Sequence, residues 1–137
     1  MPDYFGSTRS NYFRVANPEF FEEWCAHLDL TVWSKVRDEE TFYAISADPN
    51  AEGWPTRREV KDGRERPLDF HGELAEQLDP RDAAIIMEVG YEGLNYFVGT
   101  ATAIHPDGRT HTIAIADIYE RARTVFGPDI NITNAIL

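Results

Sequence analysis

The first apolar and polar positions of the chain predict a strand followed by an amphipathic helix. Residues 11–15 alternate with the two-residue period of a half-buried strand, and residues 6–10 before them are expected to form a flexible arm. Asn17 and Pro18 are typical of a helix start, because Asn caps free backbone amides and Pro fits the first turn. Apolar residues then recur at helical spacing through residues 20–28, which gives the helix one wide apolar stripe.

A hairpin and a long connector are predicted next. Residues 31–37 alternate, residues 41–47 contain the apolar run 42–45, and the polar residues between the two strands form a turn. The connector, residues 48–69, is interrupted by five Pro and Gly residues, and its Asp-Gly pair at 62–63 favours a small hairpin. A connector of this length in a compact domain is often functional.

The second half of the chain predicts a short helix, three strands and a last helix. Asp69 caps the short helix, and Pro80 ends it. Strands are expected after it over residues 83–89, 94–104 and 109–115. The last helix begins at Asp117 and ends at Gly127, and the apolar tail after it is expected to dock on the fold.

Together these elements predict one α+β domain over residues 1–137, in the order β-α-β-β-loop-α-β-β-β-α. A chain of 137 residues has the length of one domain. Because the strands come in hairpins, we expect a mainly antiparallel sheet of about five to six strands, with three helices mostly on one face. The other face is then partly solvated or meets a partner.

The charge balance narrows the range of functions. The chain has 13 Lys and Arg residues against 24 Asp and Glu residues, which gives a net charge of −11. This acidity disfavours direct binding of nucleic acid, and no apolar run is long enough to span a membrane. Because residues 56–66 carry five basic and three acidic side chains, the rest of the chain is more acidic still, at −13.

Acidic side chains recur on the predicted helices, where they are expected to form a negative surface that attracts a basic protein. The candidate contacts on the helices are Glu19, Glu22, Glu23, Glu73 and Glu76. The connector adds residue types that anchor interfaces, namely Trp54, Arg57 and Arg58. Two alternatives stay open. The charge can serve solubility alone, and Trp54 can fold back onto the sheet while the arginines pair with the chain's own carboxylates.

No catalytic or metal-binding pattern stands out among the remaining side chains. Cys25, the single cysteine, lies on the apolar stripe of the first helix, where burial as a small apolar residue is expected. The four histidines lack the spacing of a zinc motif, so no metal or other cofactor is expected. Glu88 interrupts an apolar strand and is expected on its solvent face. The lack of a disulfide and of a signal peptide indicates the cytoplasm.

Three stretches of the chain resemble small acidic proteins carried by bacterial plasmids, phages and integrative elements. The stretches are residues 5–15 (FGSTRSNYFRV), 87–94 (MEVGYEGL) and 116–120 (ADIYE). Such proteins include anti-CRISPR and anti-restriction inhibitors and toxin-immunity proteins. Many of them block a nucleic-acid-handling protein by presenting negative charge to its basic groove, as a mimic of nucleic acid. The resemblance implies an inhibitor and brings no catalytic residues.

The expected function is therefore that of a non-enzymatic acidic protein that inhibits or neutralises a basic, nucleic-acid-handling partner. One alternative is a small enzyme with a site near Glu88, His105 and His111. It requires that these side chains converge in a pocket. The other alternative is a self-associating accessory or regulatory module, which uses the uncovered sheet face as the interface of a homodimer.

Overall fold

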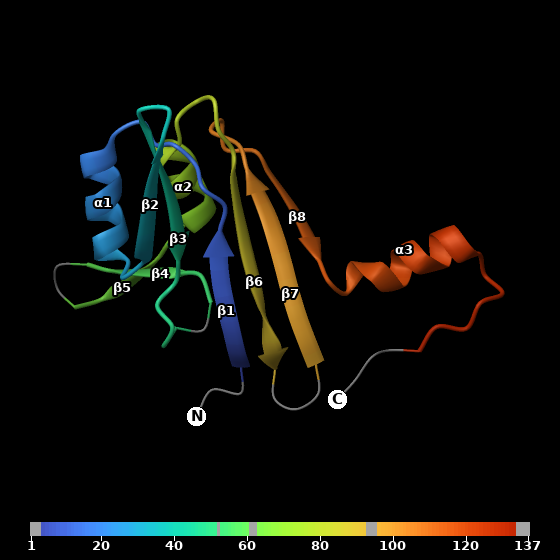
Figure 1. Ribbon diagram of the computed structural model, residues 1–137. Helices are drawn as coiled ribbons and strands as arrows, with labels where there is room; N and C mark the ends of the chain where they lie inside the picture. The colour runs from blue at the N-terminus through green and yellow to red at the C-terminus, as the bar shows by residue number, and fades with distance from the viewer. Residues whose placement is uncertain (1–3, 52, 61–62, 93–95, 134–137) are drawn as a thin grey trace.

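Strands and helices alternate along the chain in the predicted order (Figure 1). The computed structural model describes residues 4–51, 53–60, 63–92 and 96–133. The elements are β1 (Tyr4–Ser10), α1 (Pro18–His27), β2 (Thr31–Arg37), β3 (Glu40–Ser46), β4 (Arg57–Glu59), β5 (Glu65–Pro67), α2 (Phe70–Gln77), β6 (Ala84–Glu92), β7 (Tyr96–Ile104), β8 (Thr110–Ala114) and α3 (Asp117–Phe126). All strand pairs are antiparallel, so the fold belongs to the α+β class, as the sequence predicts.

The strands are divided among three sheets instead of forming the single sheet that the sequence predicts. The main sheet has four strands in the order β1-β6-β7-β8. β2 and β3 form a hairpin of their own, and β4 and β5 form a smaller one inside the connector. Because β2 is exposed along nearly its whole length, the β2–β3 hairpin stands partly away from the rest of the fold.

The first strand lies earlier in the chain than the alternating pattern predicts. Residues 6–10, expected to be a flexible arm, belong to β1 and pair with β6 in the main sheet. Residues 11–15 form only isolated bridges to other segments. Phe13 and Val15 are both buried, so the alternation in this segment reflects two side chains that pack in the core and not a strand of a sheet.

The ends of the helices follow local signals in the sequence. The side chain of Asn17 accepts a hydrogen bond from the Phe20 amide at 3.2 Å, and Asp69 accepts one from the Gly72 amide at 3.1 Å. After α3, Gly127 has a φ of 93°, a conformation that favours glycine. Capping thus fixes the starts of α1 and α2 and the end of α3.

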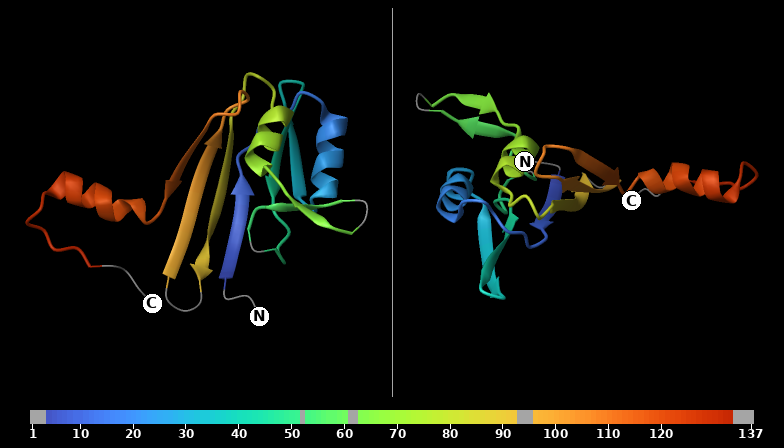
Figure 2. Two further views of the ribbon diagram at one scale, coloured as in Figure 1. Left: turned by 180° about the vertical axis from the view of Figure 1, so that it is seen from behind. Right: turned by 90° about the horizontal axis from the view of Figure 1, so that it is seen from above.

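The hydrophobic core lies between α1, α2, β3 and one face of the main sheet. The ring of Phe21 lies 5.8 Å from that of Phe13 and 5.2 Å from that of Tyr43, measured between centroids. Trp24 stacks on Phe70 at 5.5 Å, which joins α1 to α2. These aromatic contacts hold the two helices side by side at one end of the molecule (Figure 2).

α3 lies away from this core and covers neither face of the main sheet, so of the three helices predicted mostly on one face, α1 and α2 pack on the core and α3 does not. In Figures 1 and 2 it extends past the edge strand β8, at the end of the molecule opposite α1. No residue of α3 is buried, and none of the core residues comes from β8. The tail expected to dock leaves Ile130 exposed, and residues 134–137 lie outside the described residues.

Candidate interaction surfaces

α1 presents a row of carboxylates to solvent, because its apolar side is used by the core. Glu19, Glu22 and Glu23, here called the acidic face, are all exposed. Within the described chain, no ion pair joins any of the three to a basic side chain. Burial raises the pKa of the Tyr43 hydroxyl, and the nearby charge of Glu22 raises it further. The acidic face thus has no basic partner among the described residues.

The two glutamates predicted as contacts on α2 have different surroundings. Glu73 accepts a hydrogen bond from Nε1 of Trp24 at 2.9 Å and pairs with Arg58. Its carboxylate is therefore occupied inside the molecule. Glu76 is exposed to solvent. Because the Trp24 contact holds α2 beside α1, Glu76 extends the negative surface of that end of the molecule.

The connector contains the predicted small hairpin, whose arginines pair with carboxylates of the same chain. Arg58 pairs with Glu73 of α2, and Nε of Arg57 lies 3.9 Å from Oε2 of Glu65 across the hairpin. At the turn, Gly63 has a φ of 77°. The Asp of the expected Asp-Gly turn lies outside the described residues.

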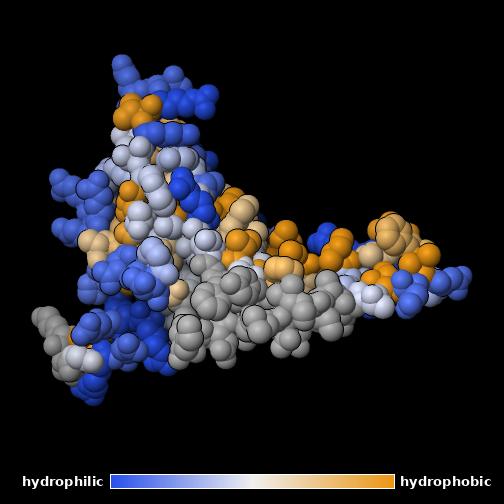
Figure 3. All heavy atoms as spheres, turned by 60° about the horizontal axis from the view of Figure 1, so that its bottom comes forward, coloured by the Kyte–Doolittle hydropathy of each residue, from blue (hydrophilic) through white to orange (hydrophobic). Residues whose placement is uncertain are grey.

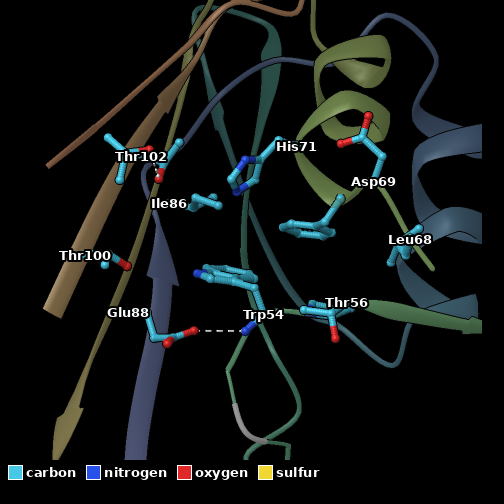
Figure 4. Close-up of a pocket in the computed structure, with 12 residues that line it drawn as sticks. Trp54, Thr56, Leu68, Asp69, His71, Ile86, Glu88, Thr100 and Thr102 are labelled. Carbon is cyan, nitrogen blue, oxygen red and sulfur yellow. Dashed lines mark hydrogen bonds between the residues drawn. The ribbon is translucent and has the colours of Figure 1, made fainter. Parts of the chain in front are cut away.

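A groove of about 420 Å³ lies between α2, the connector and the inner face of the main sheet (Figure 4). Trp54 folds back to form its wall, where its ring stacks on Phe70 at 5.4 Å and its Nε1 donates to the carbonyl of Met87 at 3.2 Å. Glu88 faces this groove and accepts a hydrogen bond from the Trp54 amide at 3.1 Å, the dashed line in Figure 4. The expected position of Glu88 on a solvent face is therefore wrong. Its carboxylate binds the connector.

The groove combines an apolar wall with several polar groups, which is typical of a surface that binds and orients a ligand. The polar groups are Thr56, Asp69, His71, Glu88, Thr100, Thr102 and Thr112. The hydroxyls of Thr102 and Thr112 lie 2.9 Å apart and hydrogen-bond each other. This pairing satisfies both hydroxyls within the sheet.

The three residues of the enzyme alternative do not meet. Glu88 faces the groove, on the inner side of the main sheet. His111 lies opposite Ala103 and alternates with the groove residue Thr112, which places it on the outer face. His105 lies in the turn before β8, where its Nδ1 is 2.9 Å from the carboxylate of Asp107. The structure therefore does not assemble a shared site from them.

Cys25 is fully buried beside the core aromatics, as its place on the apolar stripe predicts. Burial raises the pKa of its thiol to about 12, which is the opposite of the shift that activates a nucleophilic cysteine. Across the described residues, no cluster of three or more His, Cys, Asp or Glu side chains is placed to hold a metal ion. None of the helices in that part of the chain has the length and apolar character needed to cross a bilayer.

The outer face of the main sheet carries an apolar surface that no element of the described chain covers. The side chains of this apolar sheet face, exposed by 46% to 60%, are Met87, Val89, Phe97, Ile113 and Ile115. They are neighbours across the strands, since a Cβ placed on Gly99 would lie 3.6 Å from a side-chain carbon of both Val89 and Ile115. The apolar surface continues toward α3 (Figure 3).

Comparisons with known proteins add no further candidate. No family model, curated protein or solved structure matches this chain. The candidate surfaces are therefore the acidic face, the groove and the apolar sheet face. The sequence analysis identified the first from helical spacing and expected an uncovered sheet face, and the alternation of residues 109–115 put Ile113 and Ile115 of the third on one side of a strand.

Proposed function

We propose that this chain is a non-enzymatic acidic protein of the cytoplasm that binds a basic, nucleic-acid-handling protein through the acidic face and thereby inhibits it. The observation that carries the proposal is the exposure of Glu19, Glu22 and Glu23 on one helix, where no ion pair joins them to a basic side chain of the described residues. A basic groove on a partner supplies that countercharge. The resemblance to anti-defence and immunity inhibitors supports the same class of function.

Some of the other carboxylates of the body are paired with arginines of the same chain. Arg14 binds Asp82 at 2.6 Å and Glu40 at 2.8 Å, and Arg81 binds Glu40 and Asp79, each at 3.0 Å. These pairs occupy both the arginines and the carboxylates that form them. The acidic face is not part of these pairs, so its carboxylates contribute to the negative field that attracts a basic partner.

The strength of such an interface depends on how far its charges are desolvated. An exposed ion pair contributes about 0–1 kcal/mol, whereas close charge pairs at a protein interface have coupling energies of about 1.5–7 kcal/mol. Three adjacent carboxylates that enter a basic groove therefore suffice for specific binding. Because charges on a surface are screened within about 10 Å at 0.1 M salt, the affinity is expected to fall as salt rises.

The proposal is tested by removing the charge of the acidic face without changing its shape. The variant E19Q/E22Q/E23Q keeps residues of similar helix propensity, so α1 is expected to stay folded. The tagged protein is used at low salt to capture partners from an extract of its source organism. We expect the wild type to retain a basic protein and the variant to retain at least about tenfold less, equivalent to about 1.4 kcal/mol.

The matched control neutralises three carboxylates outside α1, in the variant E59Q/E65Q/D129N. It has the same net charge as the acidic-face variant, so a general effect of charge would weaken both equally. We expect the control to retain the partner as the wild type does. Equal retention by the two variants, or capture of a partner that is not basic, would contradict the proposal.

A further inference from the structure

α3 has the pattern of a helix that packs against a surface, yet none of its residues is buried within the described part of the chain. Its apolar side chains and the one that follows it are exposed by 52% to 77%, and they are Ile118, Val125, Phe126 and Ile130. A helix of 10 residues is only marginally stable in water without tertiary packing. This apolar arm, residues 117–130, therefore needs a surface that covers its stripe.

The apolar sheet face is a matching surface on the same chain. α2 and the connector lie on the opposite side of the main sheet, where they line the groove. A sheet with an apolar face is stabilised when helices or a second sheet cover that face. The chain thus carries both an uncovered apolar sheet face and an uncovered amphipathic helix.

The junction between β8 and α3 directs the helix away from its own sheet. The amide of Ile115 still donates to the carbonyl of Gly99 in β7 at 2.8 Å, one residue past the end of β8. The carboxylate of Asp117 then accepts a hydrogen bond from the Ala114 amide at 2.8 Å. Because only residues 115–116 separate strand and helix, α3 cannot turn back over its own sheet while these bonds persist. Figure 1 shows it leading outward from the sheet edge.

The charge of this region suits a second copy better than a basic protein. Residues 109–130 hold three basic and three acidic side chains, although the whole chain has a net charge of −11. The one charged side chain that the strand register places beside the apolar sheet face, within the described residues, is that of Arg9, which lies opposite Met87 and stacks on the ring of Trp33. α1, the helix that carries the acidic face, lies at the opposite end of the molecule from α3, as Figure 2 shows. Two copies can therefore meet here without bringing their main negative charges together.

The area available is that of a standard interface. Full burial of a large apolar side chain removes on the order of 100 Å² of its surface from water. The apolar sheet face and the apolar arm together have nine such side chains, each about half exposed. They therefore offer roughly 450 Å² per copy. Two copies give roughly 900 Å² of apolar area. At about 65% apolar, as in homodimers, this corresponds to roughly 1,400 Å² in total, within the about 1,200–2,000 Å² of stable interfaces.

We propose that two copies of this chain form a two-fold symmetric dimer in which the apolar arm of each copy covers the apolar sheet face of the other. The interface is isologous, because both contacts are the same pair of surfaces exchanged between the copies. The dimer is independent of the proposed function, since it uses neither α1 nor α2.

The dimer is tested by measuring molar mass with light scattering from about 1 to about 100 µM. We expect the wild type to have twice the mass of one chain over most of this range. The arm variant V125D/F126D and the sheet variant V89D/I113D are expected to dimerise at least about 100-fold more weakly, because each places carboxylates in an apolar interface. The control V36D alters Val36 of β2, which is equally exposed but lies outside both surfaces, and it is expected to remain dimeric.

A mixture of the two defective variants identifies the exchange of arms. The sheet variant keeps an intact arm and the arm variant keeps an intact sheet face, so the mixture regains one of the two contacts. We expect heterodimers at concentrations where each variant alone is monomeric. A monomeric wild type at about 100 µM, or an arm variant that dimerises like the wild type, would overturn the proposal. The arm variant changes only exposed side chains, and its circular dichroism confirms that the core is folded.

Discussion

At the residue scale, Phe20 and Phe21 show how the helical period separates neighbouring side chains. Successive residues of α1 point in directions about 100° apart, so one phenylalanine enters the core and the other does not. Phe21 is fully buried against Phe13 and Tyr43, whereas Phe20 is 59% exposed. The same period places the acidic face on the side of the helix away from the core.

The two phenylalanines are expected to differ strongly in their contribution to stability. Phe21→Ala leaves a cavity among buried rings and lowers the free energy of unfolding by about 3–5 kcal/mol. Phe20→Ala removes an exposed side chain and changes it by at most about 0.5 kcal/mol. Urea denaturation of both variants measures the difference. Similar losses in the two would show that α1 does not pack on the core by this side.

At the element scale, the connector is held on the main sheet by a close approach to Glu88. Gly53 has a φ of 107°, and a Cβ at this position would overlap the Glu88 carboxylate. The next amide, of Trp54, donates to that carboxylate. Gly53 is therefore required both for the backbone conformation and for the space, and it lets the Trp54 ring form the wall of the groove.

Substitution of Gly53 is expected to loosen the connector. Gly53→Ala combines backbone strain with a clash, and the strain alone is worth about 1–3 kcal/mol. Gly108 is the matched control, because it has a φ of 95° and no neighbouring atom within 4 Å of an added Cβ. We expect Gly53→Ala to lower the urea midpoint more than Gly108→Ala. The E88A substitution removes the side chain with which the new Cβ clashes. In the E88A background, Gly53→Ala is therefore expected to lower the urea midpoint by less than it does in the wild type. Equal losses at the two glycines would contradict a tight contact with Glu88.

The elements differ in how far the sequence predicts them, because local and long-range interactions leave different signals. Asn17 and Asp69 mark the starts of α1 and α2, and both caps are local hydrogen bonds. β1 was not predicted, since residues 6–10 are small or polar and their partner strand lies about 80 residues away in the chain. The extent of α3 follows from its periodicity, but its position beyond the sheet edge depends on the junction with β8.

The candidate surfaces also divide into those that local patterns predict and those that depend on long-range contacts. Helical spacing predicts that the carboxylates of α1 are exposed, because burial of the apolar side of the helix leaves the opposite side in solvent. The sequence left open that Arg58 pairs with a carboxylate of its own chain, but that this carboxylate is Glu73 was not predictable, since the pair depends on the fold of the connector. The position of Glu88 in the groove was not predictable for the same reason. The alternation of β6 shows on which face Glu88 lies, but not that Trp54 of the connector covers this face. Contacts made by long loops leave no periodic signal in the sequence.

At the scale of the whole molecule, a network of ion pairs joins three distant segments. Arg14, which precedes α1, binds Asp82 before β6 and Glu40 of β3. Hydrogen bonds from Arg81 hold the pKa of Asp79 at about 2, and those from Arg14 lower the pKa of Asp82. The ionised carboxylates therefore stabilise the arrangement of the β2–β3 hairpin against the main sheet.

This network is expected to make stability sensitive to acid. Because the pKa values of Asp79 and Asp82 are lower in the folded protein than the usual value of about 3.9, their contribution is complete above about pH 5 and is lost as the pH falls toward 2. Asp82→Asn is expected to lower the urea midpoint at pH 7 and to flatten its fall between about pH 5 and pH 2. The control Asp129→Asn should follow the wild type. If the urea midpoint of Asp82→Asn fell with pH as steeply as that of the wild type, the role of this carboxylate would be contradicted.

The whole molecule also separates its two interaction surfaces, with the acidic face and the apolar arm at opposite ends (Figure 2). The central claim is that the acidic face binds a basic protein through charge. The most direct measurement is capture by the wild-type protein at low salt, followed by elution in steps to about 1 M salt, where screening acts within about 3 Å. The account predicts a basic protein that is released as salt rises and that the variant E19Q/E22Q/E23Q does not retain. A partner held unchanged at about 1 M salt, or retained equally by that variant, would contradict it.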